Sequence, residues 1–546
     1  MNVSQLMIKC LEAEGVKYIF GVPGEENEDF LFALEDSSIK FIPTRHEQGG
    51  AFIADVWGRL TGKAGVCLST LGPGATNLMT GVADAHLDKA PLVALTGQGG
   101  IDRIHHESHQ IIDVVGMMKP ITKWNAKIIN GEVVHEMVRK AFKLAQAEKP
   151  GATHLELPED VAGASVKEGI KPIKPSKVYR PIPENSTINK AVEILKNAKT
   201  PIILAGNGSI RTRASKALTS LSTSLNIPVA TTFMAKGAIS DKLPNSLRAI
   251  GLGFKDYVLE AFEKADVVFC IGYDVAEYSP AKWNETKDKK IIHLDFEPAE
   301  VYEEYKARVE IVGDIANGIE AVHKNLEGTK YSNWYEDVRD RIVASIESYK
   351  SQDNSDHLNA PNVIAATREV IPDNALLISD VGSHKMWIGR NYPTYIPNGC
   401  IISNGFASMG IALPGLIAGY LVDQGRPVIS IMGDGGSLMN IQEIETAVRL
   451  GVKGVMIILN DNNYGLIKWK QQMNEGKSFG TNLGNPNFVE LAHSFGMEAY
   501  KPETIGELKE KINEAIEQNK LVLLEVAVHT EVNDELTESL KNYFNK

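Results

Sequence analysis

Short runs of apolar, β-branched residues alternate along the chain with longer segments of helical periodicity. Runs of this kind cover residues 64–70, 201–205, 266–272 and 452–460, and turn residues follow each of them. This alternation predicts an α/β fold of doubly wound parallel sheets with helices on both faces. Ligands on such sheets bind at the carboxyl ends of the strands, so candidate chemistry is sought in the turns that follow these runs.

Two stretches interrupt the alternation. Residues 167–186 carry four prolines among lysines, and residues 349–361 are polar and end in Asn-Ala-Pro. Both resemble linkers more than helices or strands. They divide the chain into an N-terminal domain at 1–170, a middle domain at 185–345 and a C-terminal domain at 358–546. A length of 546 residues is too great for one hydrophobic core and suits three domains.

The composition narrows the functional class. A net charge of −12, spread without long acidic runs, argues against a nucleic-acid partner. Cys10, Cys67, Cys270 and Cys400 are too widely separated for a metal-ligand motif, which favours a reduced, cytoplasmic compartment. Residues 1–16 form an amphipathic pattern and lack the apolar run of a signal peptide. The sequence contains no apolar segment of about 18 residues without charges, so we expect no membrane span.

A Gly-Asp-Gly sequence at 433–435 closes one of the most apolar runs, and Asn-Asp-Asn-Asn at 460–463 closes the next. Asp434 and Asp461 are 461 − 434 = 27 positions apart, a spacing that suits a strand, a helix and a second strand. Both carboxylates can then lie at one edge of a parallel sheet, where two carboxylates and a carbonyl offer the oxygen ligands that Mg²⁺ prefers. Gly-Asp-Gly alone is also common in turns without a ligand, but the complete pattern favours a metal–diphosphate site.

A glutamate near the other end of the chain makes this pattern more specific. Glu47 lies in Thr-Arg-His-Glu-Gln-Gly-Gly at 44–50, and together with Gly-Asp-Gly and the later Asn-Asp it resembles the thiamine diphosphate enzymes of the acetolactate synthase and pyruvate decarboxylase superfamily. The resemblance spans the chain, with further motifs at 20–24, 72–78, 380–384 and 405–415. It implies three doubly wound domains, which are pyrimidine-binding, middle and diphosphate-binding, and the cofactors thiamine diphosphate and Mg²⁺.

The resemblance also implies roles for single residues. Glu47 would hold the pyrimidine N1′, Met409 would support the bent cofactor, and Gln110 would reach the substrate, so these three are the candidate catalytic residues. Without the resemblance, Glu47 would be interpreted as a surface residue at the start of a helix, and Met409 as a residue that fills the hydrophobic core. The Mg²⁺ ligands would be Asp434, Asp461 and the backbone oxygen of Asn463. The positions that match the cofactor-binding motifs are Pro23, Gly24, Glu47, Asn77, Gly382, Ser383, His384, Ala407, Met409, Gly435, Gly436, Tyr464, Gly465 and Leu466.

The middle domain distinguishes the branches of the family. Gly206-Asn207-Gly208 lacks the third glycine of a dinucleotide fingerprint, and we interpret it as a tight turn. Residues 271–284 resemble the catabolic, FAD-independent acetolactate synthases. Asp461, where many relatives carry asparagine, resembles the same branch. The sequence therefore predicts no need for FAD or for a regulatory subunit.

The resemblance implies a decarboxylating carboligase that condenses two pyruvate molecules to 2-acetolactate and CO₂. The alternative is a 2-keto acid decarboxylase that releases an aldehyde; His105-His106 resembles the histidine pair of pyruvate decarboxylases but lies a few residues early. A flavin-dependent pyruvate oxidase and a catalytically silent scaffold are weaker alternatives. In the family, the N-terminal domain of one chain faces the C-terminal domain of another, which implies a homodimer with shared active sites, assembled into a homotetramer. Glu25 and Trp469 receive no role from the sequence.

Overall fold

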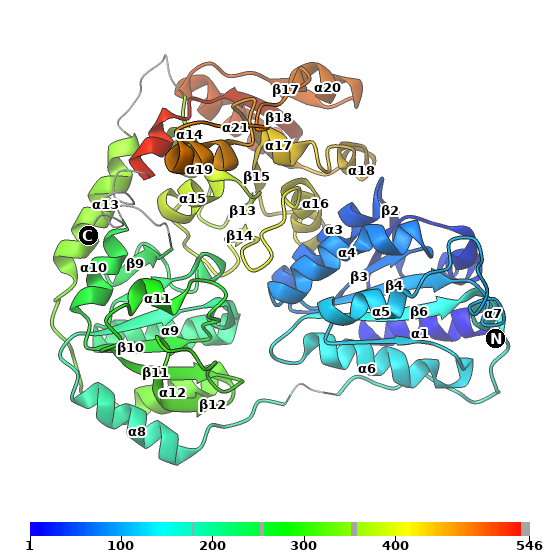
Figure 1. Ribbon diagram of the computed structural model, residues 1–546, viewed down its shortest axis with the longest axis horizontal. Coiled ribbons are helices and arrows are strands. Elements are labelled where there is room, and N and C mark those ends of the chain that lie inside the picture. Colours follow the sequence, from blue (N-terminus) through cyan, green and yellow to red (C-terminus); the bar gives the residue numbers. More distant parts are fainter. Residues whose placement is uncertain (177–178, 252–255, 351–357, 537–546) are drawn as a thin grey trace. The chain divides into compact units, whose positions relative to one another are not determined.

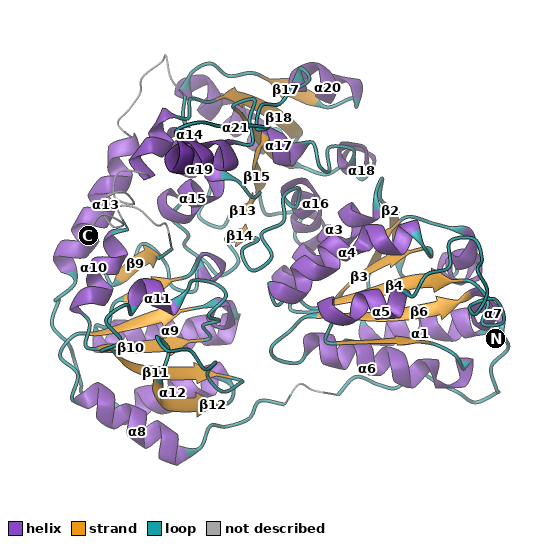
Figure 2. Cartoon of the chain, viewed as in Figure 1, coloured by secondary structure: helices purple, strands orange, loops and turns teal. Residues whose placement is uncertain are grey.

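Three six-stranded sheets organise the chain in the computed structural model, which describes residues 1–176, 179–251, 256–350 and 358–536 (Figures 1 and 2). Every strand pair within these sheets is parallel. The predicted α/β class with three parallel sheets is thus confirmed. The exact domain boundaries stay predictions, and parts of both expected linkers, 177–178 and 351–357, lie outside the described residues.

The first sheet has the strand order β2-β1-β3-β4-β6-β5. Helices α3 and α4 cover one face, and α1 and α6 cover the other (Figure 1). Its strands are β1 (Tyr18–Gly21), β2 (Lys40–Pro43), β3 (Gly65–Ser69), β4 (Leu92–Gln98), β5 (Trp124–Lys127) and β6 (Ala152–Pro158). Its helices are α1 (Val3–Glu14), α2 (Glu28–Glu35), α3 (Glu47–Thr61), α4 (Pro73–Leu87), α5 (Val114–Met118), α6 (Val134–Gln146) and α7 (Glu159–Gly163).

The second sheet has the order β12-β11-β10-β7-β8-β9, with a hydrophobic cluster on each face. Its strands are β7 (Pro201–Ala205), β8 (Val229–Thr231), β9 (Ser246–Ala249), β10 (Val267–Ile271), β11 (Lys290–Asp295) and β12 (Ala307–Val312). The helices along this part of the chain are α8 (Asn185–Lys196), α9 (Thr212–Leu225), α10 (Tyr257–Lys264), α11 (Pro280–Trp283), α12 (Ile315–Asn325) and α13 (Glu336–Lys350).

The third sheet has the order β14-β13-β15-β16-β18-β17. Its strands are β13 (Leu376–Ser379), β14 (Cys400–Ile402), β15 (Val428–Gly433), β16 (Gly454–Asn460), β17 (Glu498–Tyr500) and β18 (Leu521–Ala527). The helices here are α14 (Ala360–Val370), α15 (Ser383–Asn391), α16 (Ala412–Val422), α17 (Asp434–Ser437), α18 (Glu443–Arg449), α19 (Gly465–Glu475), α20 (Phe488–Ser494) and α21 (Ile505–Glu517).

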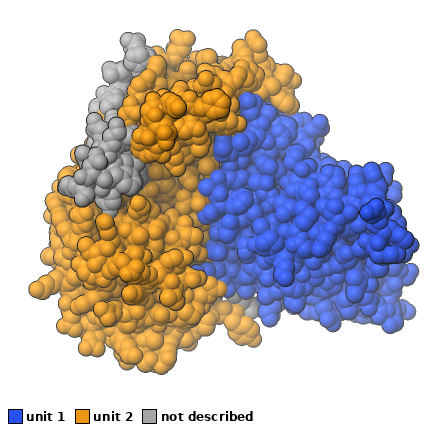
Figure 3. Space-filling view, in the orientation of Figure 1, with its two compact units in different colours: residues 1–178, 405–425, 437–452 blue, residues 179–404, 426–436, 453–546 orange. Residues whose placement is uncertain are grey.

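The packing groups the chain into two compact units (Figure 3). Unit 1 comprises residues 1–178, 405–425 and 437–452, and unit 2 comprises residues 179–404, 426–436 and 453–546. Helices α16 and α18 therefore belong to unit 1, although they follow strands of the third sheet in sequence, and α16 packs against α3. The sequence did not predict this grouping. Domains predicted from linkers are continuous stretches of the chain, whereas α16 and α18 pack in one unit with residues 1–178, which lie more than 200 positions earlier.

Helix α3 begins where His46 accepts a hydrogen bond from the backbone N–H of Gln48, and it ends at Gly62 in the left-handed region. Its buried face lies very close to β3. A Cβ atom on Gly65 would be 2.0 Å from the carbonyl oxygen of Ala54, so only glycine fits at this contact. The close packing fixes the axis of α3 and, with it, the position of its first residue, Glu47.

Strands β15 and β16 pair in parallel register, with Gly433 opposite Leu459. Asp434 follows β15 directly, and Asp461 follows β16 directly. The 27-residue spacing thus corresponds to neighbouring strands, as expected. Among the described residues, no helix is both long and apolar enough to cross a membrane.

Candidate active site

The candidate residues fall into two groups, one in each unit. Unit 1 contains Pro23, Gly24, Glu47, Asn77, Gln110, Ala407 and Met409. Unit 2 contains Gly382, Ser383, His384, Asp434, Gly435, Gly436, Asp461, Asn463, Tyr464, Gly465 and Leu466.

Glu47 is the first residue of α3 and is only 8% exposed. The side-chain amide of Asn77, on α4, donates a hydrogen bond of 3.0 Å to its Oε2. A Cβ atom on Gly74 would lie 3.2 Å from its Oε1, so the glycine lets the start of α4 approach the carboxylate closely. Glu47 is therefore not a surface residue: its carboxylate is buried and is oriented by Asn77, in the first turns of α4.

A second buried carboxylate, which the sequence analysis missed, holds the start of α3. Glu443 accepts hydrogen bonds from the backbone N–H groups of Arg45, at 3.0 Å, and His46, at 3.1 Å. Thr446 donates to its other oxygen at 2.6 Å, and a Cβ atom on Gly49 would be 2.4 Å from Glu443 Oε1. Burial raises the pKa of Glu443, and these donors oppose that rise. Glu443 therefore fixes the turn from which Glu47 projects.

The loop that contains Gln110 lies against the turn before α4. Gln110 is exposed and has a φ of +59°, and a Cβ atom on Gly72 would be 2.7 Å from its carbonyl oxygen. His105 and His106 lie on the same loop, with their rings exposed and 3.8 Å apart. The histidine pair is exposed, and Gln110 lies against Gly72, the residue that precedes α4.

Pro23 is exposed, and Gly24 lies against Thr70, since a Cβ atom on Gly24 would be 2.4 Å from Thr70 Cβ. Thr70 in turn donates a hydrogen bond of 2.5 Å to Glu26. Glu25 is exposed. Its neighbour Glu26, through the hydrogen bond from Thr70, holds the loop at 23–27 to the residue that follows β3.

Ala407 and Met409 lie on the half-buried loop before α16. Ala407 has a φ of +58°, a region that an L-residue rarely adopts, and Gly410 has a φ of +92°. Asn440 donates a hydrogen bond of 2.8 Å to the carbonyl oxygen of Gly410. The loop is thus held in an unusual backbone conformation, as is typical of functional sites.

In unit 2, polar oxygens surround the two aspartates. Asn485 donates hydrogen bonds of 2.6 Å to Asp434 and 3.0 Å to Asn460, and the backbone N–H of Asn463 donates to Asp461 at 2.9 Å. The side-chain oxygens of Asn463 and Asn485 are buried and have no hydrogen-bond partner within the described part of the chain. Unsatisfied oxygens beside two carboxylates fit a hard cation such as Mg²⁺. Asn485 was missed because Gly-Asn-Pro resembles an ordinary loop.

The protonation of this pair also suits a cation. Burial raises the pKa of Asp434. Burial, with a further contribution from the charge of Asp434, raises the pKa of Asp461 to about 6. A divalent ion would offset both effects. In the described ranges, no three His, Cys, Asp or Glu side chains form a metal cluster, so a cation here would depend on two carboxylates with amide and carbonyl oxygens.

Three glycines of unit 2 lie against polar side chains of the candidate site, at positions where a Cβ atom would approach those side chains closely. A Cβ atom on Gly382 would be 2.8 Å from His384, one on Gly436 would be 3.2 Å from Asp380, and one on Gly465 would be 2.4 Å from Asp461. Burial lowers the pKa of His384 to about 4, and its Nε2 has no hydrogen-bond partner among the described residues. A cradle without side chains and an orphaned ring nitrogen fit an anionic group such as a diphosphate.

The segment that follows Asn463 and Tyr464 forms α19. A Cβ atom on Gly435 would be 2.9 Å from the ring of Tyr464, which places that ring over the turn after β15. Leu466 is half-buried. Trp469, whose role was left open in the sequence analysis, packs against the hydrophobic core of the third sheet.

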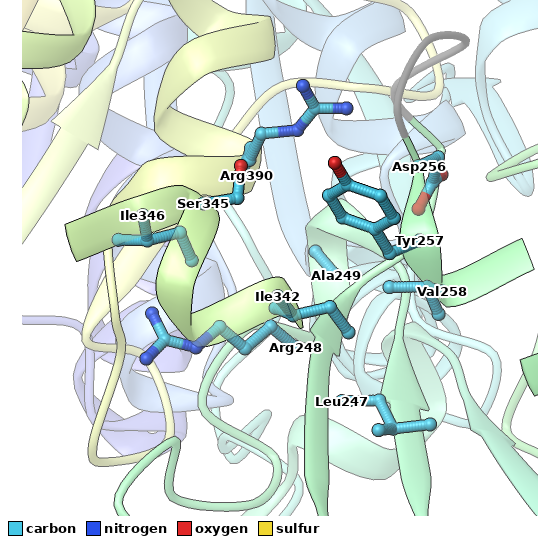
Figure 4. A pocket seen from close by; sticks show the side chains of 10 residues that line it. All are labelled: Leu247, Arg248, Ala249, Asp256, Tyr257, Val258, Ile342, Ser345, Ile346 and Arg390. Carbon is cyan, nitrogen blue, oxygen red and sulfur yellow. The ribbon is translucent and has the colours of Figure 1, made fainter. Parts of the chain in front are cut away.

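A separate small cavity of unit 2 lies where β9, α10, α13 and α15 meet (Figure 4). Its lining includes Arg248, Asp256, Tyr257 and Arg390. Its volume of about 20 Å³ holds roughly one water molecule, which is too little for a cofactor. We therefore assign it no part in the candidate site.

Comparison with known proteins agrees with this geometry. Family models described as thiamine pyrophosphate enzyme match the chain in order: the N-terminal TPP binding domain at 1–117, the central domain at 188–322 and the C-terminal TPP binding domain at 380–526. A probable acetolactate synthase large subunit of Methanococcus aeolicus is 35% identical, covering 97% of this chain and 92% of that protein. An acetolactate synthase of Bacillus subtilis is 32% identical over 96% and 93% of the two chains. A catabolic acetolactate synthase of Raoultella terrigena is 31% identical over 94% and 92%. The chain therefore belongs to the thiamine diphosphate-dependent enzymes, in the group related to acetolactate synthases.

Proposed function

We propose that this protein is a thiamine diphosphate- and Mg²⁺-dependent carboligase that condenses two pyruvate molecules to 2-acetolactate and CO₂. The observation that carries the proposal is the buried Glu47, oriented by Asn77 and held at the start of α3 through Glu443. Relatives named acetolactate synthase, at 31–35% identity over nearly the whole chain, support the choice of reaction.

The residues of the chain would divide the work as follows. Bound thiamine diphosphate supplies the electron sink for decarboxylation of a 2-keto acid. Glu47 would hold a proton at the pyrimidine N1′, with Asn77 fixing the angle of its carboxylate. Asp434, Asp461 and Asn463 would hold Mg²⁺ against the diphosphate, beside the glycines of the third sheet.

The middle domain supports an enzyme without FAD. Glu277 is buried, and its carboxylate accepts hydrogen bonds from the backbone N–H groups of Asn207, at 2.9 Å, and Asp274, at 3.1 Å, and from the hydroxyl of Thr232. In a dinucleotide-binding fold, the turn after the first strand faces the pyrophosphate. Here the carboxylate of Glu277 already accepts a hydrogen bond from the backbone N–H of Asn207, in the turn after β7.

The first experiment is a product assay. We expect the purified protein to be colourless and to form acetolactate from pyruvate with only thiamine diphosphate and Mg²⁺ added. Products from a panel of 2-keto acids are identified by mass spectrometry. Acetaldehyde as the main product would favour the decarboxylase alternative, to which His105 and His106 would contribute. A requirement for FAD would contradict our interpretation of the middle domain.

We predict that Glu47→Gln retains the cofactor but loses about 10²–10⁴-fold in kcat, because an amide accepts or donates a hydrogen bond at N1′ but cannot transfer the proton. Steady-state kinetics and calorimetric cofactor binding measure the two effects separately. Glu28→Gln, on the exposed face of α2, is the matched control and should behave like the wild type. A Glu47→Gln variant with more than about a tenth of the wild-type rate would rule out this role.

We predict unequal effects at the two aspartates. Asp434→Ala should abolish Mg²⁺-dependent retention of the cofactor, whereas Asp461→Asn, which keeps an oxygen ligand, should be mild at pH 8. Protons compete with Mg²⁺ for Asp461, whose pKa in the metal-free protein is about 6, so binding should weaken as the pH falls below 6. In the wild type, the Mg²⁺ affinity should fall by about tenfold for each pH unit below 6.

Calorimetric titration of Mg²⁺ between pH 5 and 8 provides the measurement. The dependence attributed to Asp461 should be absent in Asp461→Asn. If both variants are equally damaged at pH 8, Asp461 does not ligate the ion in the proposed way.

We also propose that the active sites are shared in a homodimer, which assembles into a homotetramer. Co-expression of Glu47→Gln with Asp434→Ala chains tests the sharing. If each site takes Glu47 from one chain and Asp434 from the other, half of the sites in a mixed dimer are intact. Random pairing then restores about a quarter of the wild-type activity. Co-expression of Glu47→Gln with the double variant is the control and leaves no intact site. No recovery in the first mixture, despite mixed dimers, would contradict shared sites.

A further inference from the structure

Four charged side chains form a buried cluster in unit 1, which we call the Arg59 quartet. The guanidinium of Arg59 contacts Asp55 at 2.7 Å, Asp84 at 2.7 Å and Asp88 at 2.8 Å. The side chain of Arg59 is 9% exposed, and the three aspartate side chains are fully buried. Asp55 and Arg59 lie on α3, Asp84 lies on α4, and Asp88 follows the last residue of α4. The quartet therefore joins the two helices that carry Glu47 and Asn77.

The quartet contains more acid than its one cation can neutralise. Burial and the charges of Asp88 and Asp55 raise the pKa of Asp84 well above its usual value. Buried ion pairs are weak evidence for stability, because removal of two charges from water offsets much of their attraction. A third carboxylate on one guanidinium therefore calls for another explanation.

Asp88 also contacts backbone groups outside the quartet. Its Oδ2 accepts from Arg59, while its Oδ1 accepts from the backbone N–H groups of Gly405, at 2.6 Å, and Phe406, at 3.2 Å. A Cβ atom on Gly405 would lie 2.6 Å from the same Oδ1. One carboxylate thus links the quartet to the loop that continues into Ala407 and Met409.

That loop needs restraint from outside. Ala407 has a left-handed backbone conformation, which an alanine does not favour when it is free. Asn440 holds the far end of the loop through Gly410, and Asp88 holds the near end through Gly405 and Phe406. Between these two anchors lie the carbonyl of Ala407 and the side chain of Met409.

We propose that Asp88 is a positioning residue, which transmits the rigidity of the Arg59 quartet to residues 405–409 and so holds Ala407 and Met409 in their working geometry. The proposal rests on the proposed function, in which this loop supports the bound cofactor. Asp88 itself contacts backbone and Arg59, and it takes no part in proton transfer.

The test compares the same substitution at two members of the quartet. Asp88→Asn replaces one of the two carboxylate oxygens by an NH₂ group, which then faces a donor, either Arg59 or the backbone N–H groups of the loop. Asp84→Asn makes the same nearly isosteric change at another carboxyl group that contacts Arg59, at 2.7 Å. Both variants remove one carboxyl group from the quartet, so a general loss of packing would affect them alike.

We expect the amides of Gly405 and Phe406 to exchange with deuterium about tenfold or more faster in Asp88→Asn, and to be unchanged in Asp84→Asn. In the holoenzyme, kcat should fall about 10–100-fold in Asp88→Asn, with a smaller change in KM, since a displaced loop misplaces the reacting groups. Equal kcat in the two variants, or unchanged exchange at Gly405 and Phe406, would overturn the proposal.

Gly405→Ala provides an independent test if Asp88→Asn does not fold. Its new Cβ atom would be 2.6 Å from Asp88 Oδ1 and 2.9 Å from the carbonyl of Leu87, so it displaces the loop while leaving the quartet intact. The same fall in kcat is expected, and wild-type kcat in this variant would contradict the proposal.

The hydrogen-exchange measurement does not depend on which substrate the enzyme uses. A wild-type protein that forms no acetolactate would refute the proposed reaction, but the exchange result would still decide the role of Asp88.

Discussion

Buried carboxylates that accept neighbouring backbone N–H groups fix three loops of the structure, two of which carry candidate residues. Glu443 holds the residues before Glu47, Asp88 holds the residues before Ala407, and Glu277 closes the turn after β7. A carboxylate can accept several hydrogen bonds at once, and charge makes each of them stronger than a neutral one. Burial is costly for such a group unless its donors are present, so the loop and the acid stabilise each other. This mutual dependence gives irregular backbone the fixed geometry that helices and strands obtain from their own hydrogen bonds.

The sequence predicted the parts of the molecule that have a local signature. Runs of β-branched residues gave β3, β7, β10 and β16 within a residue or two, and the turn residues after β15 and β16 identified Asp434 and Asp461. Each of these signals lies within one strand and its following turn. The parallel order of the strands then followed from the alternation with helices.

Residues that act through distant backbone had no such signature. Glu443 contacts a turn almost 400 positions earlier, and Asp88 contacts a loop more than 300 positions later. In the sequence, each is an acidic residue in or next to an amphipathic helix, where acidic side chains are usually exposed. Asn485 was hidden in the same way by its loop. The glycines near His384 and Asp461 were recognised by motif, but only the fold shows which side chains a Cβ atom would strike.

The path of the chain between the two units has a mechanical consequence. The polypeptide passes from one unit to the other after residues 178, 404, 425, 436 and 452. A proteolytic cut after residue 404, 425 or 436 leaves each of the two fragments with residues of both units. Only two residues, Gly435 and Gly436, separate Asp434 from the point where the chain enters unit 1. The two groups of candidate residues are thus connected through the backbone.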